Sequence, residues 1–89
     1  MFADVSAAGI ATFQNYESRV LPLLARHDGL LERRLRSTDA QTEVHVVSFG
    51  SRAGYESYMA DPERTAQRGA LDGIELRQRI VEVDDVSDA

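Results

Sequence analysis

The chain contains no cysteine, so neither a disulfide nor a thiolate metal site can stabilise it. All ten of its Lys+Arg residues are arginine, which excludes a Schiff-base lysine and the lysine of a phosphate-binding loop. Tryptophan is absent as well. No apolar run approaches the roughly 20 residues that a membrane-spanning helix needs, so we expect no membrane association.

With 89 residues, the chain is long enough for one domain, residues 1–89. A chain of this size buries only about 60–65% of the surface that its unfolded form exposes, so we expect a small core or a partner subunit. The opening segment "MFADVSAAGI" lacks the basic start and apolar stretch of a secretory signal, which favours a cytoplasmic location. The net charge of −5 makes nucleic acid an unlikely partner.

The first half of the chain begins with a weak strand pattern at residues 1–6 and continues with a helical pattern at 9–26. Pro22 should kink this helix or begin its last segment, because proline cannot donate the interior hydrogen bond. Gly29 should supply the left-handed residue that ends the helix. The apolar side of the helix recurs at steps of three and four: Ile10, Phe13, Tyr16, Val20, Leu23, Leu24 and His27.

Residues 29–37 and 42–49 are predicted to form an antiparallel hairpin around a polar turn at 37–41. In the second strand, Val44 and Val46 should face the helices, because β-branched residues suit an apolar core. Alternation then turns the side chains on either side of them, His45 among them, toward the opposite face of the sheet.

A second helical region is predicted at residues 51–73, in two pieces. Ser51 is the expected N-cap of the first piece. Asp61 as N-cap and Pro62 at the first helical position should begin the second piece, which Gly73 closes.

Residues 74–83 are predicted as a final strand, and the acidic segment 84–89 should fray. The element order is therefore β-α-β-β-α-β, which predicts an α+β fold of the ferredoxin-like class. Such a fold has a four-stranded antiparallel sheet with both helices on one face. The other face would need a second subunit to cover it.

The sequence resembles the dimeric α+β barrel superfamily over nearly its whole length, from about Phe13 to Val83. Three segments carry the resemblance: "YESRVLPLLARHDGLLERRLRS", "TEVHVVSFGSRAGYESYMADPER" and "EVDDV". They are similar to a group of small proteins of unknown function and, more distantly, to antibiotic-biosynthesis-type monooxygenases and NIPSNAP-type domains. The resemblance implies a homodimer whose two sheets face each other, with ligands held between sheet and helices in the members that are enzymes.

Haem-degrading members of that superfamily use an asparagine of the first strand, a histidine of the second helical region and a tryptophan of the sheet. This chain has no tryptophan, its second helical region at 51–73 has no histidine, and Asn15 lies in the first helix. Haem degradation is therefore not expected, whereas a cofactor-free monooxygenase depends mainly on pocket shape and stays open as an alternative.

His45 is the first candidate catalytic residue. Its expected position is near the middle of the sheet, on the face that meets the second subunit, where Glu32 or Glu82 could be its acidic neighbour. It would then act either as the general base of a pocket or as a polar contact that locks the dimer. The second candidate, His27, is either a general base at a pocket mouth or a helix-end histidine favoured by the helix dipole.

Candidate ligand-binding residues are Arg34, Tyr55 and Tyr58. Arg34 and Arg36 share a strand face, so they could clamp an anionic ligand or form ion pairs with Glu32, Glu43 or Glu82 across the sheet. The tyrosines stand at helical spacing and either pack against the sheet or present a hydroxyl to a cleft.

Two functions remain open from the sequence. The first is a small homodimer that binds a small organic molecule and has the option of acting on it. The second is a non-catalytic dimerisation or interaction module. No metal or other cofactor is expected, because the two histidines are 18 residues apart and belong to no metal-binding motif.

Overall fold

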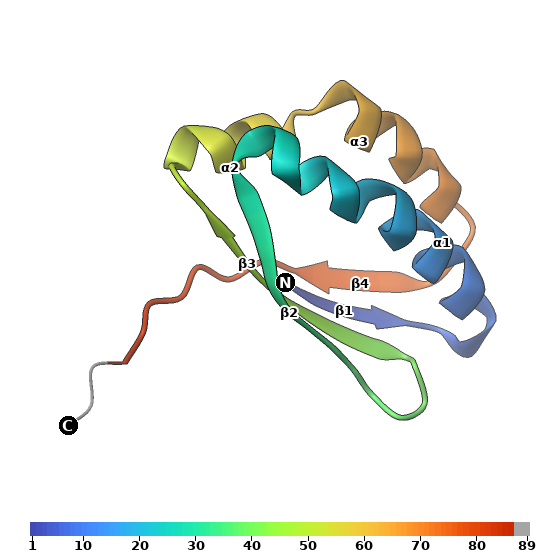
Figure 1. Cartoon of the computed structure of the whole chain (residues 1–89). Helices are drawn as coiled ribbons and strands as arrows, with labels where there is room; N and C mark the ends of the chain where they lie inside the picture. Colours follow the sequence, from blue (N-terminus) through green and yellow to red (C-terminus); the bar gives the residue numbers. More distant parts are fainter. Residues whose placement is uncertain (87–89) are drawn as a thin grey trace.

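The computed structural model describes residues 1–86. It has a four-stranded antiparallel sheet in the order β2-β3-β1-β4, with the helices packed on one side (Figure 1). The elements are β1 (Phe2–Val5), η1 (Ala7–Gly9), α1 (Ile10–Val20), η2 (Leu21–His27), β2 (Gly29–Arg36), β3 (Thr42–Phe49), α2 (Arg52–Met59), α3 (Pro62–Gln67), η3 (Arg68–Leu71) and β4 (Leu76–Arg79). This α+β arrangement is compatible with the predicted class.

The first helical region changes character at Pro22, as predicted. The α-helix α1 ends at Val20, and a 3-10 segment, η2, continues with proline in its first turn. The expectation for Gly29 is wrong, because the left-handed residue that ends η2 is Asp28, with φ of 57°. Gly29 is instead the first residue of β2, where a Cβ would lie 2.8 Å from the ring of Phe49.

The β2–β3 hairpin forms as predicted, but it contains an irregularity in β2. The pairing shifts between Leu31 and Arg33, so Glu32 is an extra residue in its strand. Because of this bulge, Leu31 and Arg33 do not share a face, contrary to the simple alternation expected. Beyond the bulge, Arg34 lies opposite His45.

The caps of the second helical region are confirmed. The Ser51 side chain accepts a hydrogen bond from the Gly54 backbone N–H at the start of α2. The Asp61 carboxylate accepts from two backbone N–H groups at the start of α3, and Pro62 is the first residue of that helix. Gly73 has φ of 87°, which suits the expected closing glycine.

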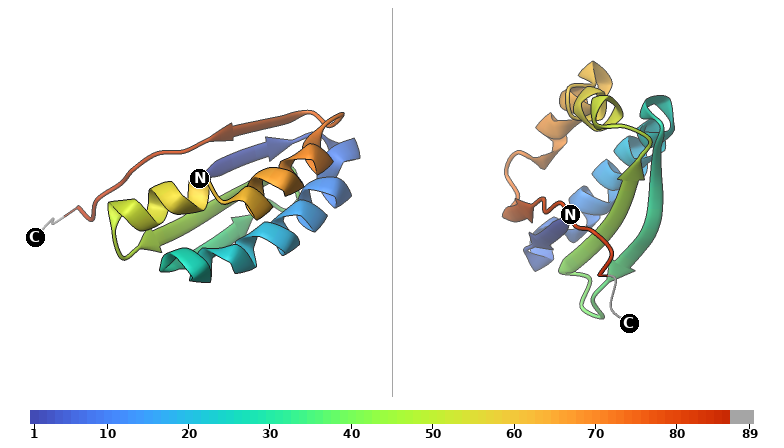
Figure 2. Two further views of the ribbon diagram at one scale, coloured as in Figure 1. Left: turned by 90° about the horizontal axis from the view of Figure 1, so that it is seen from above. Right: turned by 90° about the vertical axis from the view of Figure 1, so that its left-hand side faces the viewer.

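The last strand is shorter than predicted, because β4 ends at Arg79. Its pairing with β1 also ends there, at the Phe2–Arg79 pair, so residues 80–83 have no neighbouring strand within the part of the chain that the structure describes. The chain beyond β4 extends away from the sheet (Figures 1 and 2). Residues 84–86 are exposed, and the rest of the predicted tail, 87–89, lies outside the described residues.

The predicted facing of β3 is wrong. His45 is 3% exposed and lies under the helices, while Val46 is exposed on the opposite face. Glu43, two residues before His45, is buried beside it on the helix side. The cause is electrostatic compensation, because arginine side chains of β2 pair with the Glu43 carboxylate and make its burial possible.

The core lies between β1 and the first helix. Its buried members are Ala3, Val5, Phe13, Tyr16, Val20 and Leu71. Every apolar position of α1 and η2 that is buried belongs to the periodic set predicted from the sequence. None of the helices in the described part of the chain has the length and hydrophobicity required to cross a membrane.

Candidate functional site

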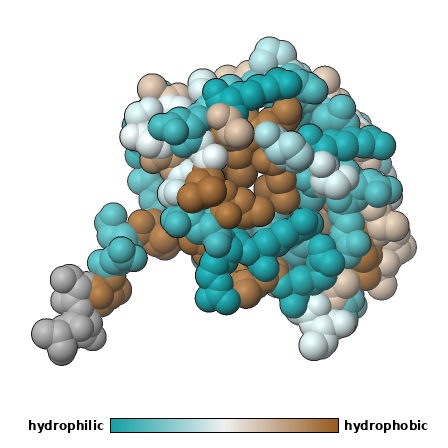
Figure 3. Space-filling view, viewed as in Figure 1, coloured by the Kyte–Doolittle hydropathy of each residue, from teal (hydrophilic) through white to brown (hydrophobic). Residues whose placement is uncertain are grey.

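A cavity of about 710 Å³ opens between the sheet and the helices. Figure 3 shows an apolar, hollowed area on this face of the molecule, bordered by hydrophilic residues. The cavity draws its walls from β1, β3, β4, α1, η2, α2, α3 and the chain that follows β4, and its lining residues include Phe2, Val44 and Val46 of the opposite sheet face. Its volume falls within the range of about 300–1,000 Å³ that is usual for small-molecule sites.

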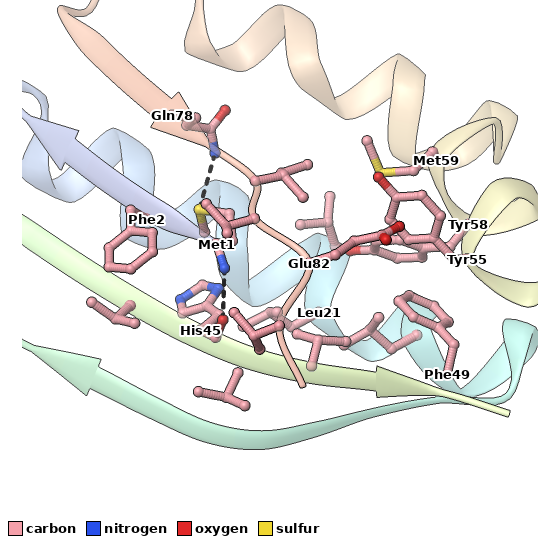
Figure 4. Close-up of a pocket in the computed structure, with 18 of the residues that line it drawn as sticks. Met1, Phe2, Leu21, His45, Phe49, Tyr55, Tyr58, Met59, Gln78 and Glu82 are labelled. Atoms are coloured by element: carbon pink, nitrogen blue, oxygen red, sulfur yellow. Dashed lines mark hydrogen bonds between the residues drawn. The ribbon is translucent and has the colours of Figure 1, made fainter. Parts of the chain in front are cut away.

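One end of the cavity is aromatic. Phe49, Tyr55 and Tyr58 gather there with Met59, whereas His45 lies toward the other end (Figure 4). The Phe49 ring centroid lies 5.6 Å from that of Tyr55 and 5.8 Å from that of Tyr58. Both predicted tyrosines therefore line the cavity, and their rings form a wall suited to a flat apolar group.

His45 is held in one orientation by Glu43. The His45 Nε2 atom lies 2.7 Å from Glu43 Oε1, and both side chains are buried. Burial lowers the pKa of the His45 imidazole and outweighs the opposing effect of Glu43, so the ring is neutral. Because an ionised carboxylate only accepts hydrogen bonds, Nε2 carries the single ring proton and Nδ1 keeps a free lone pair.

Glu43 is ionised because two arginines contact it. Burial alone would raise the pKa of the Glu43 carboxyl, but hydrogen bonds from Arg34, His45 and Arg36 lower it to about 2. Arg34 Nε donates to Glu43 Oε1 and Arg36 Nε donates to Glu43 Oε2, both at 2.9 Å. The predicted ligand-binding residue Arg34 is thus engaged by Glu43 and is not among the residues lining the cavity.

Glu17 of α1 is a site residue that the sequence did not predict. Its side chain lines the cavity, is 4% exposed, and places Oε2 3.8 Å from Nδ1 of His45. Burial, followed by repulsion from Glu43, raises the pKa of the Glu17 carboxyl to about 7. The sequence does contain a signal for this residue: Glu17 stands four residues after Phe13 and three before Val20, so a carboxylate lies on the apolar side of the helix.

Arg64 of α3 brings a positive charge to the cavity wall. Its guanidinium lies 4.9 Å from the ring centroid of Tyr58. Among residues 1–86 it forms no ion pair with a carboxylate, and its buried Nε atom has no hydrogen-bond partner. Burial raises the pKa of the Tyr58 hydroxyl, with Arg64 opposing the shift, so this tyrosine is a neutral donor.

His27, the second predicted catalytic residue, is not among the residues that line this cavity. Its Nδ1 atom lies 2.7 Å from the Ser57 hydroxyl and its Nε2 atom 2.7 Å from Asp61 Oδ2. The hydrogen bond from His27 is the largest cause of the lowered pKa of Asp61. Both ring nitrogens therefore connect η2 to the junction of α2 and α3.

The chain after β4 forms part of the cavity wall. Residues 80–84 line it, and Glu82 points toward Tyr55 and Tyr58 (Figure 4). The Glu82 carboxylate also forms an ion pair with Arg52 at the start of α2. Both side chains of this pair are exposed, so the ion pair adds little to the stability of this segment.

The cavity therefore combines apolar walls, the guanidinium of Arg64 and the facing side chains of Glu17 and His45. His45 Nδ1 is a hydrogen-bond acceptor, and protonated Glu17 is a donor. In the described part of the chain, no set of three or more His, Cys, Asp or Glu side chains is placed to hold a metal ion. The chemistry that these residues offer is polar recognition and proton transfer.

Comparison of the chain with protein-family models, with curated proteins and with solved structures finds no match.

Proposed function

We propose that the protein binds a small organic molecule in the cavity between sheet and helices. The single observation that carries this proposal is the composition of the wall, in which an aromatic end formed by Phe49, Tyr55 and Tyr58 accompanies Arg64, whose buried Nε atom has no hydrogen-bond partner among the described residues. A few convergent polar groups in an apolar cavity are typical of ligand sites.

The polar groups also indicate what kind of molecule fits. Arg64 supplies a guanidinium with an unpartnered buried nitrogen, which favours a carboxylate or carbonyl oxygen. The pair formed by Glu17 and His45 supplies one donor and one acceptor. The proposed ligand therefore has an apolar body about the size of one ring and an oxygen-rich end.

Titration calorimetry with 3-phenylpropanoate as the ligand tests the binding proposal. We expect saturable binding to the wild-type protein and at least tenfold weaker binding to Arg64→Gln, because one buried charge-assisted contact contributes about 1.5–3 kcal/mol. Arg19→Gln is the matched control, since Arg19 is an exposed arginine of α1 outside the cavity. Absence of saturable binding, or equal affinities of the two variants, would contradict the proposal.

We further propose that the chain has the ferredoxin-like fold and pairs into a homodimeric α+β barrel through the uncovered face of the sheet. Three large apolar side chains support this, because Phe2, Leu35 and Val46 are all exposed on that face. A monomer this small has little else to cover them.

Light scattering at micromolar concentration should return about twice the 9.9 kDa mass of one chain. Val46→Glu should shift the mass toward that of a monomer, because it places a charge in the middle of the apolar face. Ala11→Glu adds the same charge on the exposed side of α1 and should leave the dimer intact. A wild-type mass near 9.9 kDa would overturn the dimer.

A further inference from the structure

We infer that Glu17 and His45 act together as an acid–base pair that moves a proton between the oxygen and the α-carbon of an enolisable carbonyl compound. The compound is bound in the cavity, so this inference rests on the proposed function. It adds a reaction, keto–enol tautomerisation, and names the two groups that touch the reacting atoms.

The geometry of the two side chains supports this reaction. Glu17 comes from α1 and His45 from β3, so two separate elements bring them to the same cavity. Glu17 Oε2 and His45 Nδ1 are 3.8 Å apart, too far for a direct hydrogen bond. Among the residues described, no hydrogen bond engages either atom. A ligand can therefore place an oxygen against Nδ1 of His45 and the neighbouring carbon against Oε2 of Glu17.

The surroundings prepare the two groups for opposite roles. Glu43 accepts the Nε2 proton of His45 and leaves Nδ1 as the base, while Arg34 and Arg36 keep Glu43 ionised. Burial raises the pKa of Glu17 to about 7, so its carboxyl stays protonated in acidic solution and in part at neutral pH, and it can act as the acid. Proton-transfer sites typically hold two titratable groups whose surroundings shift their pKa values in opposite directions.

The reaction balances without any oxidant, reductant or co-reactant. In the enol-to-ketone direction, Nδ1 of His45 takes the hydroxyl proton, and the electron pair of that O–H bond becomes the carbonyl π bond. The C=C electron pair takes the proton of Glu17 and forms the new C–H bond. The imidazolium then returns its proton across the 3.8 Å gap to the Glu17 carboxylate, which restores both groups.

The wall of the cavity narrows the substrate class to 2-oxo acids with an apolar side chain. Arg64 would take the carboxylate, and the aromatic end formed by Phe49, Tyr55 and Tyr58 would take the side chain. The carbonyl or enol group then lies between these anchors, with its oxygen within reach of His45 and its neighbouring carbon within reach of Glu17.

The test uses the enol of phenylpyruvate, whose ultraviolet absorbance disappears as it converts to the ketone. We expect the wild-type protein to accelerate this conversion, and Glu17→Gln to reduce kcat at least 100-fold, within the range of about 10²–10⁴ that general acid–base catalysis contributes. Glu56→Gln, an exposed carboxylate of α2, is the matched control and should keep the wild-type rate. Titration of both variants with 3-phenylpropanoate, which cannot enolise, measures ligand affinity independently of catalysis.

The pH profile gives a second readout that a structural role would not produce. The wild-type kcat should fall as the pH rises through about 7, where Glu17 loses its proton. The charged groups that act on Glu17 come from β3, β2, α3 and η3: Glu43, Arg34, Arg64 and Arg68. His45→Gln should also abolish acceleration, and far-ultraviolet circular dichroism establishes whether that variant folds.

The outcomes separate the two proposals. Failure to bind 3-phenylpropanoate overturns the proposed function and this inference with it. Binding without acceleration above the buffer rate overturns the inference alone. Acceleration that persists unchanged in Glu17→Gln assigns the proton transfer to other groups and also overturns it.

Discussion

Replacing Glu43 with glutamine should lower the free energy of unfolding by about 2–4 kcal/mol. The carboxylate of Glu43 is 2% exposed and receives hydrogen bonds from Arg34, Arg36 and His45. A glutamine has only one acceptor oxygen, and its amide would direct N–H groups at an arginine. Breaking a fully buried ion pair usually lowers the free energy of unfolding by about 3–5 kcal/mol. We expect a somewhat smaller loss here, because both arginines are partly exposed.

Urea denaturation at pH 7, followed by circular dichroism, measures this effect. The matched control is Glu32→Gln, which removes an exposed carboxylate from the bulge of the neighbouring strand and should change stability by less than about 0.5 kcal/mol. Equal stabilities of the two variants would mean that the buried network does not stabilise the fold. The same network orients His45, so Glu43→Gln should also slow any proton transfer.

The order of the elements followed from the sequence because all of them except the first strand have a strong local signal. The apolar period of three and four residues marks α1, and the dense β-branched segment marks β3. Asp61 followed by Pro62 marks the start of α3. These signals depend only on neighbours in the chain, so no tertiary contact was needed to interpret them.

The sequence could not show in the same way which side chains of β3 point toward the helices. Period-two alternation separates His45 from Val44 and Val46, but it does not say which set is inside. Apolarity favoured the two valines, whereas the structure buries His45 and Glu43. Their burial depends on arginines of another strand, beyond a bulge that has no clear sequence signal.

The candidate site was predicted in part for the same reason. His45, Tyr55 and Tyr58 were named from the sequence, and all three line the cavity. Glu17 and Arg64 were not named, because each is an ordinary charged residue on a helix until the fold brings it to the cavity. Whether any of these side chains is catalytic stays a prediction.

The contribution of Glu17 to the stability of the protein should fall as the pH rises from about 4.5 to 7. In the unfolded chain this carboxyl titrates near its ordinary pKa of 4.5, whereas burial raises the pKa in the folded protein to about 7. Between these values the unfolded chain loses a proton that the folded protein keeps, so unfolding becomes more favourable. The difference corresponds to about 3 kcal/mol, fully lost above pH 7.

Glu43 acts in the opposite direction at lower pH. Its folded pKa is about 2, below the ordinary 4.5, so its contribution is present above pH 4.5 and is lost as the pH falls toward 2. Taken by themselves, the two carboxyls would place the maximum of stability near pH 4.5 to 5, whereas the lowered pKa of His45 makes its own contribution increase as the pH rises to 6.5. This maximum lies lower than is usual, because a buried carboxyl that must ionise opposes folding at neutral pH.

The variant Glu17→Gln tests the part of the stability–pH profile between about pH 4.5 and 7 that Glu17 controls. At pH 8 the variant should be more stable than the wild-type protein by about 2–3 kcal/mol, because glutamine removes the cost of a buried charge. At pH 4.5 the two should differ little, since the wild-type carboxyl is then mostly protonated in the fold. Urea denaturation across pH 4 to 9 measures both, with Glu56→Gln as the exposed control. A variant that is destabilised equally at both pH values would show that the Glu17 carboxylate is satisfied in the folded protein, and the assignment of Glu17 as a proton donor near neutral pH would fail with it.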